Sequence, residues 1–331
     1  MTSHPLPSIN RREFLARTVI SALALSRASL GRAAVLDASV LGANTAMPGF
    51  GLLEAVEAVR ALGFPAVEIH PFGAPEPQPG VFPGFQFDRL AAADKRRIRE
   101  ALTGFRCVTT HLPFIEMHFF SRFAPVAEFS IRQMEIAMEA TAFFGATVAV
   151  AHVTAPSWPQ KLEDVWPDIL QRFRQWGDAA ARGGFKIAIE TGYPASVRDF
   201  VRLVKEIGHD AVGAAIDVGH QVAYADFAAR VKPAERNTPA GIAAYNDVMH
   251  EILDALGRKI IHFHVHDVDP KTWKDHRPLG TGVVDYPRLL RKLKQIGYGG
   301  LLIFELESTR ERVKADLADS KRRLETFLAG A

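Results

Sequence analysis

The sequence has little cysteine, little net charge and no long apolar run, and each of these absences excludes a class of protein or of site. Its 331 residues contain one cysteine, Cys107, which excludes an internal disulfide and the cysteine-rich zinc sites. Lys and Arg exceed Asp and Glu by only three charges and form no basic stripe, so the sequence predicts no nucleic-acid partner. The apolar run at residues 19–25 is too short to span a bilayer, so we expect no stable membrane insertion.

The rest of the composition is that of a globular protein. Hydrophobic residues make up 48% of the chain and charged residues 23%. Barrels of alternating strands and helices often run about 200–250 residues as one domain. We find no internal repeat, low-complexity tract or domain boundary after the N-terminal segment, which favours a single domain over residues 36–331.

Residues 1–35 differ in character from the remainder of the chain. Arg11 and Arg12 are followed by Phe14 and Leu15 and then by a mild apolar run at 19–25. Two arginines, any residue and two apolar residues resemble a twin-arginine export signal, which predicts a periplasmic or secreted protein and the export machinery as a partner. The alternative is an amphipathic N-terminal helix of a cytosolic protein.

From residue 36 onward, short β-rich runs alternate with helical patterns. Strict alternation indicates a parallel sheet, and eight units indicate an α/β protein built as a closed (β/α)8 TIM barrel. An open doubly wound sheet would carry a Gly-x-Gly-x-x-Gly loop after its first strand, and LGANTAMPGFG lacks that pattern. The longer connections, 71–93 and 225–240, follow strands, on the face where barrel active sites form. The eight runs are DASVLGAN, AVEIH, CVTTHLP, TVAVAHV, KIAIET, AVGAAIDVGH, IIHFHVHD and GLLIFELE.

Six consecutive runs end in, or carry near their end, an imidazole or a carboxylate. On a barrel these side chains converge at the carboxyl-terminal mouth. A carboxylate at the end of an apolar strand is costly to bury unless it is paired or bound to a cation. Carboxylates and imidazoles together suit Mn²⁺, Zn²⁺, Co²⁺ or Mg²⁺. The residues are His111, His152, Glu190, Asp217, His264 and Glu305.

The run HFHVHD places three histidines at alternate positions. Residues i, i+2 and i+4 of a strand share one face, so His262, His264 and His266 point the same way. We expect His264 to bind the metal and its two neighbours to support it, since a metal-bound imidazole needs a partner for its other nitrogen.

The motifs THLP, AHVT, IAIET, AIDVGH, HFHVHD, HRPLGTGVVDY and GGLLIFELE resemble the xylose isomerase-like TIM-barrel superfamily, and within it the sugar phosphate isomerases and epimerases. This resemblance implies one divalent ion, a sugar substrate, a role in carbohydrate metabolism and a homo-oligomer. It assigns the metal to Glu190, Asp217, His264 and Glu305, and contact with the substrate to His220. We expect His111, His152 and His276 to contact the substrate as well.

The reaction that the resemblance implies is proton transfer next to a carbonyl. The metal stabilises an enediolate, one of Glu190 and Glu305 removes the carbon-bound proton, and the other returns a proton. Return to the opposite face gives an epimerase, and return to the neighbouring carbon gives an isomerase.

Three different functions fit parts of the pattern. The first is a metal-dependent lyase or hydrolase acting on 3-keto glycosides, which an exported location favours. The second is a phosphodiesterase like the AP endonucleases of the same superfamily, but Lys274 stands where they carry an aspartate and would repel a third zinc ion. The third is a non-catalytic sugar-binding barrel, which the complete set of metal positions argues against.

Overall fold

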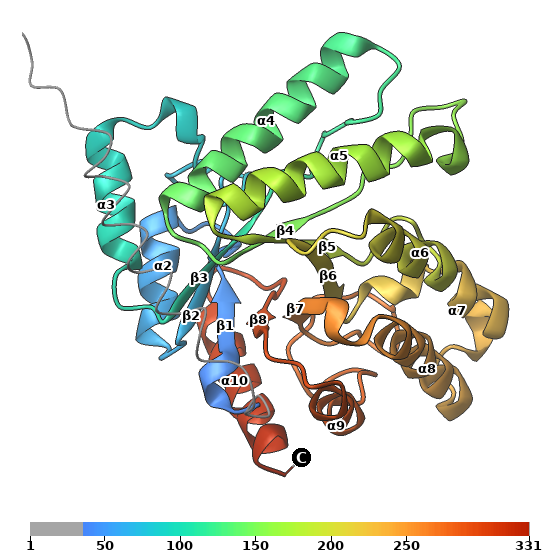
Figure 1. Cartoon of the computed structure of the whole chain (residues 1–331). Helices are drawn as coiled ribbons and strands as arrows, with labels where there is room; N and C mark the ends of the chain where they lie inside the picture. Colours follow the sequence, from blue (N-terminus) through green and yellow to red (C-terminus); the bar gives the residue numbers. More distant parts are fainter. Residues whose placement is uncertain (1–35, 331) are drawn as a thin grey trace, which may run out of the picture. The chain divides into compact units, whose positions relative to one another are not determined.

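The alternating runs fold into eight strands, each followed by at least one helix, over residues 36–330, the part of the chain that the computed structural model describes (Figure 1). All neighbouring strands are parallel, and β8 pairs with β1, so the sheet closes into a barrel. The predicted TIM barrel is confirmed. The strands are β1 (Leu41–Asn44), β2 (Ala66–Ile69), β3 (Cys107–His111), β4 (Val148–Ala151), β5 (Lys186–Glu190), β6 (Val212–Asp217), β7 (Ile260–Val265) and β8 (Leu301–Phe304).

Helices surround the strands and bury their apolar faces against them (Figure 1). Their ends follow local rules: Ser196 caps α6 by accepting a hydrogen bond from the Asp199 N–H, and α6 stops at Gly208, which adopts the left-handed conformation. The segment 225–240, predicted as a loop, contains the short helix α7 (Ala225–Arg230), the 3-10 helix Pro233–Glu235 and the first residues of α8 (Pro239–Leu256). The helices are α2 (Leu52–Ala61), α3 (Ala92–Leu102), α4 (Ala124–Phe143), α5 (Leu162–Gly183), α6 (Val197–Ile207), α7 (Ala225–Arg230), α8 (Pro239–Leu256), α9 (Tyr286–Ile296) and α10 (Val313–Gly330).

Inside the barrel, an apolar layer lies beneath a polar one. Ala188 precedes Glu190 by two residues on β5, and Ala215 precedes Asp217 by two on β6. Alternate residues of a strand share a face, so the same register that fills the barrel with small side chains carries the carboxylates to its carboxyl-terminal end. The apolar layer forms small clusters separate from the core under the helices: Ala66, Leu301 and Ile303, and Val150, Ala188 and Ala215.

The predicted export signal falls on residues 1–35, which lie outside the described residues, so the boundary at residue 35 stays a prediction. Within residues 36–330, no helix combines the length and the apolar character that crossing a membrane requires.

The close approach at Gly42 gives a test of the barrel interior. A Cβ at this position would lie 2.4 Å from Ile303 Cδ1 and 2.9 Å from the Ala66 carbonyl oxygen. We expect Gly42→Ala to lower the free energy of unfolding by about 1–3 kcal/mol through overpacking, as measured by urea denaturation. Gly330→Ala, where a Cβ meets no atom within 4 Å, is the control and should not destabilise the protein. Equal stability of the two variants would contradict this packing.

Candidate metal centre and substrate cavity

The four residues predicted to bind a metal meet at the carboxyl-terminal ends of β5 to β8. Nδ1 of His264 lies 2.6 Å from Glu190 Oε1 and 2.9 Å from Glu305 Oε2. Oδ2 of Asp217 lies 4.0 Å from the same nitrogen. One donor atom from each of the four residues lies within 4.8 Å of the others, so the four can share one ion.

The charges in this cluster fit a divalent cation. Three carboxylates held together repel one another, and buried charge without a partner is costly. Burial alone would raise the pKa of Glu305, but the nearby charge of His264 outweighs it and lowers the pKa to about 2. Glu190 shows the same balance, and its pKa lies well below the ordinary value. The carboxylates are therefore ionised, and they offer the oxygen ligands that hard cations prefer.

A fourth carboxylate holds the other side of the His264 ring. Glu68, on β2, is fully buried, and its Oε1 lies 2.9 Å from Nε2 of His264. Its Oε2 accepts a hydrogen bond from the Thr109 hydroxyl at 3.0 Å. Burial would raise the pKa of Glu68, but the imidazoles of His264 and His262 outweigh it and hold the pKa well below its usual value. Glu68 thus fixes the ring orientation and turns Nδ1 toward the candidate ligands.

The two neighbours of His264 support carboxylates. Nε2 of His262 lies 3.0 Å from Glu68 Oε2, in a fully buried position beneath the cluster. The backbone N–H of His276 donates to Nδ1 of His266, so Nε2 of His266 donates to both oxygens of Asp217, at 2.9 and 3.0 Å. All three histidines of the run therefore face the interior, as the alternation predicts.

The cavity above the cluster has a volume of about 500 Å³ and a mixed lining. Glu190 and Glu305 form part of its floor, while Phe82, Phe114 and Pro48 contribute apolar surface. The exposed Trp158, at 91%, does not line it. The four histidines predicted to contact the substrate all line this cavity: His111, His152, His220 and His276.

Three of these histidines show how fixed partners set their charge and direction. Nδ1 of His220 donates to the Thr191 carbonyl at 2.6 Å, which leaves Nε2 for the cavity. Burial lowers the pKa of His152, so the ring is neutral, and its Nε2 lies 2.7 Å from Glu190 Oε2. Burial would also lower the pKa of His276, but the Asp275 carboxylate and other nearby acids raise it to about 10. The cavity therefore contains both neutral and cationic imidazole donors.

Three further groups of described residues have the composition of a metal site. In each group, one donor atom from each residue lies within 4.8 Å of the others. Each group adjoins the four-residue cluster because it shares one residue with it: His264, Glu190 or Asp217. The groups are Glu68, His262 and His264; His111, His152 and Glu190; and Asp217, His266 and His276. Lys274 is engaged elsewhere, because its ammonium pairs with Glu307 at 2.7 Å.

The loop that carries His276 is held by Asp267. This buried carboxylate accepts hydrogen bonds from the backbone N–H groups of Val268, Gly280, Gly282 and Val284. A Cβ on Gly282 would lie 2.2 Å from Asp267 Oδ1, so only glycine permits this approach. Asp267 is a structural residue that shapes the segment HRPLGTGVVDY.

The predicted set of site residues left out Glu68, whereas His262 and His266 were expected as the neighbours that support His264. A glutamate inside the apolar run AVEI was the available signal for Glu68, because a buried carboxylate needs a partner. The pairing itself connects β2 with β7, which are not adjacent in the barrel, and no local pattern specifies it.

An eight-stranded parallel barrel with carboxylates and imidazoles gathered at the ends of its strands defines a class of TIM-barrel proteins built around a candidate metal centre. Residues 56–326 match the family described as xylose isomerase-like TIM barrel, and the chain belongs to this family. The predicted superfamily is thereby confirmed.

Curated relatives share parts of the sequence. An uncharacterized protein of Methanocaldococcus jannaschii is 23% identical over 216 residues, which are 63% of this chain and 67% of that protein. The L-ribulose-5-phosphate 3-epimerase UlaE of Salmonella typhimurium is 37% identical over 87 residues, but this stretch covers only 26% of this chain and 30% of the epimerase.

Solved structures share the fold over most of the chain. A D-tagatose 3-epimerase-like protein superposes with a TM-score of 0.66 at 20% identity, covering 87% of this chain and 97% of that one. The 3-keto-D-glucoside 4-epimerase of E. coli gives 0.60 at 16% identity, covering 86% and 99%. A xylose isomerase-like TIM barrel protein from Mycobacterium smegmatis in complex with magnesium gives 0.62 at 16%, covering 89% and 99%. Sugar epimerases are thus prominent among the structural neighbours.

The contact between Glu68 and His264 gives the first test of the centre. Glu68→Gln keeps the shape of the side chain but removes the charge that orients the imidazole and raises its basicity. We expect the affinity of the metal-free protein for Mn²⁺ to fall about 10–100-fold, as measured by calorimetric titration. Glu100→Gln, on the exposed face of α3, is the matched control. Unchanged affinity in Glu68→Gln would remove this residue from the centre.

The titration of His264 gives the second test. Burial would lower the pKa of His264, but Glu190, Glu68 and Glu305 outweigh it and raise the pKa well above its usual value. Without a cation the ring is therefore protonated at neutral pH, and a metal must displace that proton. We expect Mn²⁺ affinity to rise with pH across the neutral range by about tenfold per unit for each proton displaced. A flat profile would show that the site binds the ion without releasing a proton from His264.

Proposed function

We propose that the protein is a divalent-metal-dependent sugar isomerase or epimerase. The observation that carries this proposal is the placement of two glutamates, Glu190 buried and Glu305 partly buried, around one point. Glu190 and Glu305 both approach Nδ1 of His264, and both line the same cavity. Two carboxylates that flank one substrate position can remove a proton on one side and return it on the other.

Glu190 and Glu305 have complementary roles in the proposed proton transfer. A substrate carbonyl bound above the centre places the neighbouring C–H against Glu190 or Glu305, which accepts the proton. The other glutamate returns a proton to the opposite face in epimerisation, or to the adjacent carbon in isomerisation. A divalent ion held by Glu190, Asp217, His264 and Glu305 would supply Lewis-acid stabilisation of the enediolate.

Histidines position both the glutamates and the substrate. Nε2 of His152 lies 2.7 Å from Glu190 Oε2, while the other oxygen of Glu190 faces the centre, 2.6 Å from Nδ1 of His264. His220 is fixed through its Nδ1 and offers Nε2 to a substrate oxygen. His276, cationic at neutral pH, lies 3.9 Å from Glu305 Oε2 and can stabilise negative charge on that side of the cavity.

The lining of the cavity supports an unphosphorylated sugar. None of the described residues that line it is a lysine or arginine. Lys274 and Arg277, in the loop that carries His276, both pair with Glu307, which lines the cavity. A phosphate dianion would therefore meet no unpaired lysine or arginine, the side chains that usually bind it, and the only cations among the described residues of the lining are imidazoles.

A second candidate is a lyase or hydrolase acting on 3-keto glycosides. The same proton abstraction, followed by departure of the group on the next carbon, gives elimination. His220 lines the cavity, and Asp217 raises its pKa against the effect of burial, so this imidazole can protonate a leaving oxygen. The structural likeness to a 3-keto-D-glucoside 4-epimerase agrees with a keto-sugar ligand.

The phosphodiesterase and the non-catalytic barrel receive less support. The phosphodiesterase would need a third acidic site, and Lys274 occupies the position of its aspartate. A non-catalytic barrel has no need for two ionised glutamates beside a cavity. We also propose that residues 1–35 direct twin-arginine export to the periplasm or beyond the cell, on the strength of the Arg11–Arg12 pattern.

The proposed chemistry is tested by deuterium incorporation. The metal-loaded protein is incubated in D₂O with free, phosphorylated and 3-keto sugars, and mass spectrometry and NMR locate deuterium next to a carbonyl. We expect Glu190→Gln and Glu305→Gln each to slow exchange at least about 100-fold, because each removes a proton acceptor. Glu100→Gln is again the control. Unchanged exchange in either active-site variant would remove that glutamate from the reaction, and no exchange with any sugar would overturn the proposal.

A further inference from the structure

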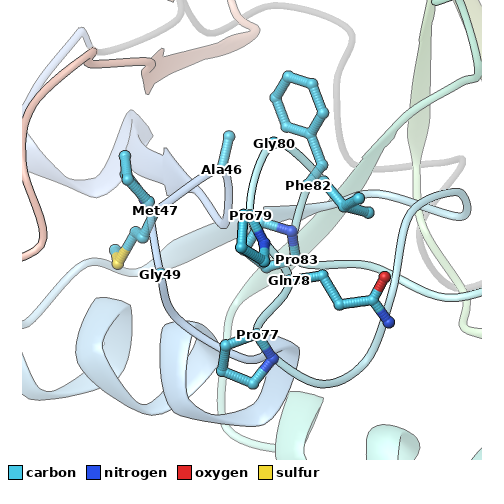
Figure 2. Close-up of a pocket in the computed structure, with 11 residues that line it drawn as sticks. Ala46, Met47, Gly49, Pro77, Gln78, Pro79, Gly80, Phe82 and Pro83 are labelled. Atoms are coloured by element: carbon cyan, nitrogen blue, oxygen red, sulfur yellow. The ribbon is translucent and has the colours of Figure 1, made fainter.

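A second cavity, of about 570 Å³, adjoins the substrate cavity. Two segments face each other across it, residues 46–49 after β1 and residues 77–83 in the loop after β2 (Figure 2). Ala46, Pro48 and Phe82 line both cavities, so the second opens beside the first. We call it the annex.

The walls of the annex are uncharged and largely apolar. Among the described residues that line it, Gln78 alone has a polar side chain. The nearby Arg310 is engaged elsewhere, because its guanidinium donates to the Gly49 carbonyl, pairs with Glu54 at 2.7 Å and stacks over Phe50. An anionic group in the annex would therefore lose water without gaining a cation, whereas an apolar group would lose only water.

Hydrogen bonds and close packing hold the loop that forms one wall in a defined conformation. The Ala74 N–H donates to the Phe82 carbonyl at 3.0 Å, and the Gly84 N–H donates to the Ala74 carbonyl at 2.8 Å. A Cβ on Gly84 would lie 1.8 Å from the Phe72 carbonyl oxygen, so the chain is closely packed there. Three prolines of this loop, among the lining residues, further restrict the backbone. A preformed wall costs little ordering entropy when a ligand binds.

We propose that the annex binds an uncharged aryl or alkyl group joined to the sugar, so that the substrate is a glycoside with an apolar aglycone. This inference rests on the proposed function, which places the sugar in the adjoining cavity. Because Ala46, Pro48 and Phe82 line both spaces, the annex lies directly beside the substrate cavity, and a group joined to the sugar would reach it over their side chains. Lining residues that are mostly prolines and apolar side chains match a flat ring or short alkyl chain.

The test measures binding to the full chain loaded with Mn²⁺, by calorimetry. The probes are the methyl glycoside, the phenyl glycoside and the 1-phosphate of glucose, galactose and mannose. We expect at least one sugar whose phenyl glycoside binds about tenfold or more tightly than its methyl glycoside, from the apolar area of the ring, with the phosphate weakest. Equal binding of phenyl and methyl forms for every sugar, a preference for phosphate, or no glycoside binding would each overturn the proposal.

A variant assigns the preference to the annex. Val81 lines it and is 41% exposed, so Val81→Asp adds a charge there with little risk to folding. We expect this variant to lose most of the phenyl-over-methyl ratio. Ile115→Asp, at an aliphatic residue 47% exposed outside both cavities, is the matched control and should keep the ratio.

The outcomes separate this inference from the proposed function. A phenyl preference that depends on Val81, without deuterium exchange, would keep the annex and overturn the isomerase. Exchange together with a ratio that Val81→Asp leaves intact would keep the enzyme and overturn the annex. If sedimentation shows instead that Val81→Asp changes only the oligomeric state, the annex is covered by a second copy and the proposal is wrong.

Discussion

The candidate centre depends on the imidazole of His264, which stands between opposing groups of carboxylates. Glu68 holds its Nε2 from β2, while Glu190 and Glu305 approach its Nδ1. Without the ring, the buried carboxylates on both sides would lose the positive charge that they share, which is costly. The register of each strand must therefore be exact. A strand that slipped by one residue would point its carboxylate or imidazole out of the barrel, toward the helices. Closure of the barrel supplies that constraint.

The sequence predicts those parts of the site that depend on local periodicity. The alternation of apolar runs and helical stretches specifies the barrel, and a two-residue period carries Glu190, Asp217 and His264 to one end of it. Glycine readily adopts the left-handed conformation that ends a helix, so it predicts helix ends such as the one at Gly208. Each of these features depends only on residues close together in the chain, so a short stretch of sequence is enough to predict it.

Features that arise from contacts across the barrel could not be predicted in the same way. Glu68 meets His264 although 196 residues separate them, and the register between distant strands decides that meeting. Asp267 looks like a further site residue in HFHVHD, yet its two oxygens accept hydrogen bonds from four backbone N–H groups of one loop. The direction of Lys274 likewise depends on the position of Glu307. In each case the sequence gives the residue type, but only the folded structure gives its partner.

The fold alone does not choose among reactions, because one barrel supports many chemistries through its loops. The distribution of charge around the centre narrows the choice. Negative charge is concentrated at the floor, where the proposed cation and proton transfer would need it, while Lys274, Arg277 and Arg310 are all paired with glutamates. Farther from the centre, the loop at residues 77–83 lines its cavity with uncharged and mostly apolar residues. A ligand suited to the whole surface is polar where it meets the carboxylates and uncharged elsewhere, which describes a neutral sugar derivative better than a sugar phosphate.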